Sequence, residues 1–100
     1  MASSSQQPQT PVDVRHNPAA SRYEARVEGL LSVAEYMRSG DTIVFTHTLV
    51  PEKLRGRGIA EQLVRTALAD ARREKLRVVP NCSYVRRFIE RHPELVDRVS

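Results

Sequence analysis

With 100 residues, of which 40% are hydrophobic and 28% are charged, the chain has the size and composition of one globular domain with a small core. No apolar run approaches the roughly 18 residues that span a membrane, no signal peptide is recognisable, and one cysteine cannot close an intramolecular disulfide, so we expect a cytoplasmic protein with no membrane partner. The formal net charge of +4 favours anionic partners such as nucleic acid, phosphorylated cofactors or acidic surfaces, although a small basic protein can also be simply soluble.

The N-terminal half predicts a short tail and then a series of strands. The first eleven residues, MASSSQQPQTP, hold no large apolar side chain after Met1, so we expect a disordered tail over 1–11 and a single domain over 12–100. Four runs then have the pattern of strands: 12–16, 22–29, 30–40 and 42–50. The run at 30–40 also has the length of a helix. Because turn residues separate these runs at short spacing, they predict an antiparallel meander.

From Gly56 the apolar period changes to 3.6 residues and predicts helices. A stripe of small and branched apolar residues identifies the first helix: Ile59, Leu63, Ala67 and Ala71. A short strand at 76–80 and a second helix from Ser83 to near Pro93 follow. The fold class is therefore α+β, a mixed sheet in which the antiparallel meander leads into β-α-β-α through a right-handed crossover.

The segment RGRGIA, residues 55–60, links the last meander strand to the first helix. The first backbone N–H groups of a helix have no intrahelical acceptor, and together with the helix dipole they attract anions. Gly56 and Gly58 let a ligand approach the backbone, and Arg55 and Arg57 add donors that suit phosphate. The segment predicts a phosphate site, and the alternative is an ordinary surface loop with a tight turn. It is not a Walker loop, because the spacing and the terminal Lys-Ser/Thr are missing. It is not a dinucleotide fingerprint, because the strand before it belongs to an antiparallel meander and no second βαβ half follows.

The pattern Arg55-x-x-Gly58-x-Ala60 matches the Arg/Gln-x-x-Gly-x-Gly/Ala motif of the GNAT N-acetyltransferase superfamily. The stretches THTLVPEKLRGRGIAEQLV and LRVVPNCSYVRRFIERHPEL extend the likeness, so residues 12–96 resemble the minimal GNAT-like subgroup. This resemblance implies acetyl-CoA as the cofactor and transfer of its acetyl group to an amine, on a small molecule or on a protein lysine. The acceptor itself cannot be read from the chain, and we expect a monomer or weak homodimer without a metal.

The resemblance also implies where the cofactor binds. The pyrophosphate would contact the loop donors of the motif, which here are Arg55, Gly56, Arg57, Gly58, Ile59 and Ala60. The pantetheine would run along the backbone of Leu49 and Val50, where the strand at 42–50 splays from the strand at 76–80. One backbone N–H in this gap would polarise the thioester carbonyl. Asn81 would anchor amide groups of the cofactor.

Acetyl transfer needs a group that accepts a proton from the amine and one that returns a proton to the thiolate. Many members of the superfamily have a glutamate near the end of the strand before the loop, where this chain has Leu49. His47, two residues earlier on the same face, is our candidate base, and the alternative is a strand histidine that packs. Cys82 is either the nucleophile of an acetyl-cysteine route or a small residue lining the cofactor tunnel. Tyr84 either protonates the thiolate or packs.

Two other kinds of function compete with an N-acetyltransferase. A CoA-binding module with little or no catalysis is suggested by the missing glutamate and by the small size of the chain. A nucleic-acid-binding domain fits the positive charge but not the aromatic residues, because the five of them are spread along the chain and predict no stacking platform. We therefore expect no nucleic-acid partner.

Overall fold

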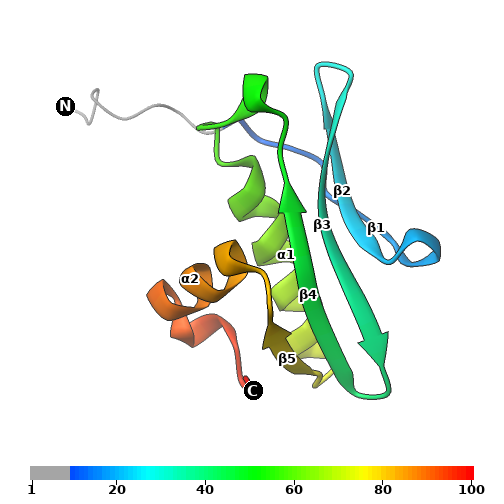
Figure 1. Ribbon diagram of the computed structural model, residues 1–100, viewed down its shortest axis with the longest axis vertical. Coiled ribbons are helices and arrows are strands. Elements are labelled where there is room, and N and C mark those ends of the chain that lie inside the picture. The colour runs from blue at the N-terminus through cyan, green and yellow to red at the C-terminus, as the bar shows by residue number, and fades with distance from the viewer. Residues whose placement is uncertain (1–9) are drawn as a thin grey trace.

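The computed structural model describes residues 10–100, in which two helices accompany one five-stranded sheet (Figure 1). The strands and α-helices in chain order are β1 (Arg15–Asn17), β2 (Arg22–Val27), β3 (Leu30–Ser39), β4 (Thr42–Leu49), α1 (Ile59–Arg73), β5 (Arg77–Pro80) and α2 (Ser83–Arg91). Three short 3-10 helices lie between or after them, at Pro18–Ala20, Glu52–Leu54 and Pro93–Leu95. The strands lie side by side in chain order, antiparallel from β1 to β4, and β5 pairs with β4 in parallel. The predicted α+β fold, a meander followed by β-α-β-α, is confirmed.

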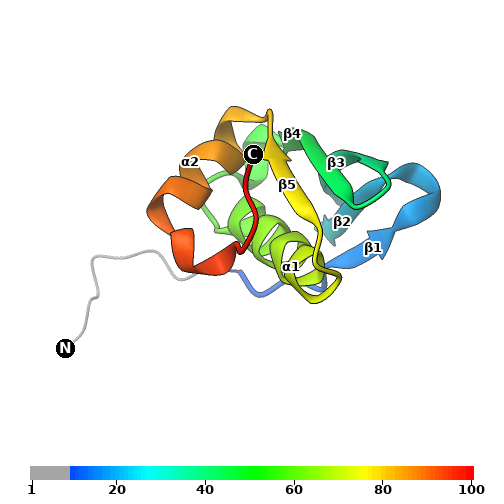
Figure 2. The ribbon, with the colours of Figure 1, turned by 90° about the horizontal axis from the view of Figure 1, so that it is seen from below.

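Helix α1 lies along one face of the sheet, and α2 lies beside the edge strand β5 (Figure 2). The apolar stripe that predicted α1 is buried, with Leu63 fully buried in the first half of the helix. It packs against inward-facing side chains of the sheet, among them Tyr23 and Phe45. The hydroxyl of Tyr23 donates a hydrogen bond to Asp70 Oδ2 of α1 at 2.8 Å, so a polar contact also ties the helix to the sheet.

The first expected strand is placed differently, because β1 covers 15–17 rather than 12–16. Residues 12–14 instead lie against α1, where Val12 and Val14 pack on the core and the Val12 N–H donates to Gln62 Oε1 at 3.1 Å. Most of the expected disordered tail, residues 1–9, lies outside the described residues, whereas Thr10 is hydrogen-bonded to the protein.

Strands β3 and β4 pair with one change of register. Glu35 lies opposite His47, whereas the next residue of β3, Tyr36, lies opposite Phe45. Thr46 is therefore an extra residue of β4, which makes this point a β-bulge. Its hydroxyl donates to the backbone carbonyl of Glu35 at 3.3 Å.

The bulge reverses which side chains of β4 face the helices. Before it, Phe45 faces inward and is buried. After it, Thr48 pairs with the inward-facing Ala34 and faces inward, while His47 and Leu49 face outward. His47, the candidate base, and Leu49, which stands in the usual glutamate position, therefore both lie on the outer face of the sheet.

Strands β4 and β5 separate where the bulge begins. Their pairing ends where Phe45 lies opposite Pro80, and the Cys82 N–H then donates to the Phe45 carbonyl at 2.9 Å. The chain turns there into α2, while β4 continues to Leu49 without a described strand on that side. This divergence is the splay that the family resemblance implied.

Candidate functional site

A loop joins the free end of β4 to α1, and two glycines determine its shape. Leu54 is fully buried and anchors the loop to the core. Gly56 and Gly58 then have φ values of 85° and 78°, in the left-handed region that favours glycine. At Gly56 a Cβ would meet no atom within 4 Å, so the backbone conformation rather than crowding calls for glycine there. The helix begins directly after Gly58.

The loop presents a run of backbone N–H groups that have no acceptor among the described residues. We call residues 56–60 the anion loop, and within the described part of the chain none of their N–H groups donates a hydrogen bond. Gly58 is the N-cap residue of α1 and brings no side chain that could satisfy them. The Gln62 N–H donates to the Gly58 carbonyl at 3.2 Å. The anion loop is thus an arrangement that binds phosphate groups well.

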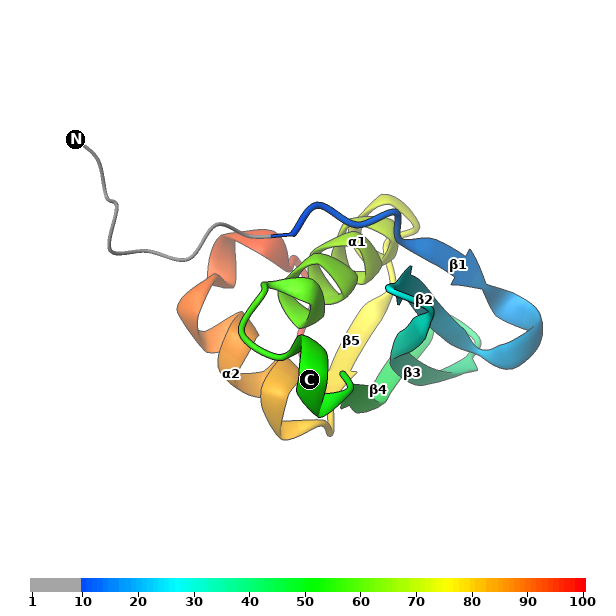
Figure 3. The same cartoon turned by 90° about the horizontal axis from the view of Figure 1, so that it is seen from above.

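These N–H groups border a groove made of two adjoining hollows, of about 240 Å³ and about 300 Å³. Both hollows are lined by Val50, Arg55, Ala60 and Tyr84. The first extends over the anion loop, and the second extends along the end of β4 over Thr48 and Leu49. Figure 3 shows the starts of α1 and α2 on either side of the end of β4. The groove therefore joins a phosphate-binding end to the free end of a strand.

The two arginines of the loop behave differently. Arg55 lines both hollows, and its Nε donates to the Val50 carbonyl at 3.3 Å. Arg57 lines neither hollow, because its Nη1 is paired with Glu28 Oε2 at 2.7 Å in the turn between β2 and β3. The hydrogen bond from Arg57 holds the pKa of the Glu28 carboxyl below its usual range. Arg55 is thus the side chain that reaches the groove.

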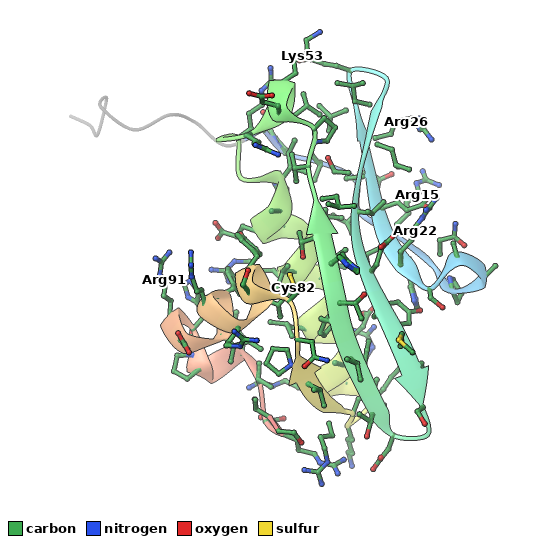
Figure 4. The ribbon with its side chains drawn as sticks, in the orientation of Figure 1. Arg15, Arg22, Arg26, Lys53, Cys82 and Arg91 are labelled. Atoms are coloured by element: carbon green, nitrogen blue, oxygen red, sulfur yellow. The ribbon has the colours of Figure 1, made fainter. Side chains whose placement is uncertain are left out.

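Cys82 lies between β4 and the start of α2 (Figure 4). It is the N-cap residue of α2 and is 9% exposed. Its Sγ lies 3.5 Å from the hydroxyl of Thr48, which in turn lines the second hollow. Sequence reasoning did not select Thr48, because only the bulge turns it inward. The thiol therefore lies behind the wall of the groove and lines neither hollow itself.

His47 lies on the other side of β4. Its side chain is 66% exposed on the outer face of the sheet, and its Nδ1 is 3.7 Å from Glu35 Oε1. Because Thr48 faces inward toward Cys82, the imidazole of His47 and the thiol of Cys82 lie on opposite sides of β4. Leu49 follows His47 on the outer face and is 56% exposed. The structure therefore brings His47 near Glu35 rather than near Cys82.

Tyr84 belongs to the groove and Asn81 does not. Tyr84 lines both hollows, stacks on Phe88 with ring centroids 6.3 Å apart, and has its pKa raised by burial. Its hydroxyl therefore stays protonated to higher pH than an exposed phenol. Asn81 lines a different hollow of about 330 Å³, together with Arg86 and Val99, which shares no residue with the groove.

Comparison with known proteins identifies the family. A model of the GCN5-related N-acetyl-transferase family matches residues 22–99, which include the end of β4, the anion loop and the start of α2. This chain is a member of that family. Curated relatives include protein NATD1 of Bos taurus, 35% identical over 86 residues, and protein NATD1 of Homo sapiens, 33% identical over 86 residues. Each alignment covers 83% of this chain and 76% of the relative.

The fold of the family member is also similar to a solved structure. The NMR solution structure of a GCN5-like protein from Staphylococcus aureus superposes with a TM-score of 0.70 and 19% sequence identity, covering 88% of this chain and 87% of the other. At that identity the similarity concerns the fold. Among the helices of residues 10–100, none combines the length and the apolar character that crossing a membrane requires.

Proposed function

We propose that this member of the GCN5-related N-acetyltransferase family binds acetyl-CoA in the groove and transfers the acetyl group to an amine. The observation that carries the proposal is the anion loop, where successive backbone N–H groups have no acceptor among residues 10–100, at one end of a groove. Such groups favour an anion, because each one is otherwise satisfied only by water. The diphosphate of coenzyme A is an anion of the right kind.

The groove residues suit the rest of the cofactor. The guanidinium of Arg55 adds a charged donor beside the anion loop. Beyond Phe45 no strand among the described residues pairs with β4 on the β5 side, so backbone polar groups of β4 would be available to the amides of pantetheine. Val50 and Leu49 supply apolar contact along the same path. When bound there, acetyl-CoA would supply an acetyl thioester at the point where β4 and β5 separate.

In a direct transfer, two side chains would move the protons. His47, exposed on the outer face, would accept a proton from the amine. Tyr84 lines the groove and keeps its proton at neutral pH, so it would protonate the departing thiolate. Cys82 lines neither hollow and is largely buried, so we favour its role as a small residue behind the groove over the acetyl-cysteine route.

A second candidate function is binding of acetyl-CoA without catalysis. Leu49 is the observation that favours this second function, because its exposed aliphatic side chain stands where many members of the superfamily have the glutamate base. The imidazole of His47 lies near Glu35, and both side chains are partly exposed on the outer face of the sheet. A protein of this kind would need the anion loop and the groove but neither His47 nor Tyr84.

Thermal unfolding with different ligands tests the shared part of both proposals. Acetyl-CoA at about 100 times its Kd should stabilise the fold by roughly 2.7 kcal/mol. For a domain of this size, that corresponds to a rise in Tm of about 10 °C or more. RNA and DNA should raise the Tm much less. A larger and salt-sensitive rise with nucleic acid would contradict acetyl-CoA binding as the function.

Acetyl transfer to a panel of amines separates the enzyme from the binding module. For the enzyme, we expect transfer by the wild type, reduced transfer by His47→Ala and Tyr84→Phe, and little change in Cys82→Ala. Transfer that falls only in Cys82→Ala, with an acetyl group found on Cys82 by mass spectrometry, would instead establish the acetyl-cysteine route. Binding without transfer to any amine would favour the binding module.

A further inference from the structure

The residues before β1 are attached to the anion loop by hydrogen bonds. The Thr10 N–H donates to the Arg57 carbonyl at 3.0 Å. The Thr10 carbonyl accepts from Gln62 Nε2 at 2.6 Å, and the Val12 N–H donates to Gln62 Oε1 at 3.1 Å. Figure 3 shows this segment running alongside α1. We call residues 10–12 the strap, since they connect the loop and the helix from outside.

Gln62 connects the strap to the anion loop through one side-chain amide. It lies in the first turn of α1, on the part of the helix that follows the loop directly. Its Nε2 donates to the Gly58 carbonyl at 3.2 Å as well as to the Thr10 carbonyl. Its own backbone N–H also donates to the Gly58 carbonyl. The donors and the acceptor of this side chain are therefore all used inside the protein.

These contacts determine which way two peptide units of the loop face. In a planar trans peptide the C=O and the N–H point in opposite directions. Thr10 holds the Arg57 carbonyl, so the N–H of Gly58 points the opposite way. Gln62 holds the Gly58 carbonyl, so the N–H of Ile59 points the opposite way. Gly58 and Ile59 line the groove, and neither N–H group donates to an acceptor in the part of the chain that the structure describes.

We propose that Gln62 is a positioning residue for the cofactor and that, with the strap, it orients the Gly58 and Ile59 N–H groups toward the groove before a ligand arrives. The identity of the ligand rests on the proposed function. Glycine has more conformational freedom to lose than other residues, so a loop with Gly56 and Gly58 gains affinity when contacts order it in advance. The side chain of Arg57, which is paired with Glu28, is a second fixed point of the loop.

Two substitutions test the proposal in the full chain. Gln62→Met keeps the length of the side chain and removes its hydrogen bonds. Thr10→Pro removes the N–H that holds the Arg57 carbonyl and leaves α1 unchanged. Thr66→Val is the matched control, because Thr66 lies one turn further along the same side of α1 and makes no hydrogen bond through its hydroxyl among the described residues.

Backbone NMR provides a readout without ligand. In the wild type and in Thr66→Val, the amide order parameters of Gly58 and Ile59 should be near 0.85, as in rigid backbone. In Gln62→Met and Thr10→Pro they should fall toward about 0.6. Unchanged order in both variants would overturn the proposal, whatever the ligand of the groove is.

Affinity for acetyl-CoA, measured by titration of the same samples, provides the second readout. Loss of one or two hydrogen bonds that order the loop should weaken binding about tenfold in Gln62→Met and Thr10→Pro. Thr66→Val should bind like the wild type. Full affinity in both variants would overturn the positioning role. A wild type that binds no acetyl-CoA would instead refute the proposed function, while the order parameters would still decide the role of Gln62.

Discussion

Replacing Gly58 by Asp or by Asn gives the sharpest test of the anion loop. Gly58 has φ 78° and is the N-cap residue of α1. Asn and Asp tolerate the left-handed region better than other residues with a side chain, and both are preferred at N-caps. Both variants should therefore fold. Because the two side chains have nearly the same shape, the difference between them isolates one negative charge.

The size of that difference follows from the position of the charge. The carboxylate that Gly58→Asp introduces would lie next to the unpaired N–H groups of the loop, close to a diphosphate bound there. At a separation of about 6 Å and an effective dielectric constant near 20, two like charges repel by about 3 kcal/mol. Gly58→Asp should therefore bind acetyl-CoA about 100-fold more weakly than Gly58→Asn.

Isothermal titration calorimetry measures both affinities, and circular dichroism shows whether each variant keeps its secondary structure. Raising the salt concentration should reduce the difference between the variants, since it is electrostatic. Equal affinity of folded Gly58→Asp and Gly58→Asn for acetyl-CoA would refute the reasoning, because the diphosphate would then lie elsewhere.

Two further predictions concern stability. Leu63→Ala empties a fully buried position between α1 and the sheet and should destabilise the fold by about 2–5 kcal/mol, lowering the Tm by about 10 °C or more in calorimetry. Burial raises the pKa of each of the three tyrosines above 10, and for Tyr23 the hydrogen bond to Asp70 raises it further. Because the pKa of each phenol is higher in the folded than in the unfolded state, the protonated tyrosines stabilise the fold below about pH 10, and this contribution to the free energy of unfolding is lost as the pH rises further. Tyrosinate absorbance should therefore appear together with unfolding, and a phenol that titrates near pH 10 in the folded protein would contradict this.

Much of the fold could be predicted because its apolar patterns are regular. The alternation in β2 and β3 and the 3.6-residue stripe of α1 each describe an element with one buried face, so the periods identify them. The position of the anion loop could be predicted for a similar reason. Gly56 and Gly58 stand where a strand gives way to a helix, and their conformation in the structure is one that favours glycine.

The remaining features of the site depend on contacts between distant residues. Gln62 is bonded to a segment 50 and 52 residues earlier in the chain, and a glutamine near a helix start carries no sign of such a partner. The side chain of Arg57 pairs with Glu28, 29 residues away in the chain, although an arginine between two glycines suggested a contact with phosphate. The bulge is a single extra residue, Thr46, within a run of β-branched residues, so the composition of β4 does not reveal it.

The bulge has a chemical consequence for the two candidate catalysts. A cysteine nucleophile usually needs a base within hydrogen-bond reach, and histidine commonly serves. Here the side chains of His47 and Cys82 lie on opposite sides of β4, so the imidazole cannot activate the thiol in this arrangement. If Cys82 is acetylated at all, Thr48 and the start of α2 are its neighbours, and His47 takes no part in that step.

This geometry predicts how the two residues affect the separate steps of transfer. Incubation with acetyl-CoA, without an amine, should label Cys82 equally fast or equally slowly in the wild type and in His47→Ala, as followed by mass spectrometry. With an amine present, His47→Ala should slow acetyl transfer by about 10²–10⁴-fold, the usual contribution of a general base. Slower labelling of Cys82 in His47→Ala would show that the imidazole reaches the thiol, and the assignment of the two residues to opposite faces of β4 would be wrong for the working enzyme.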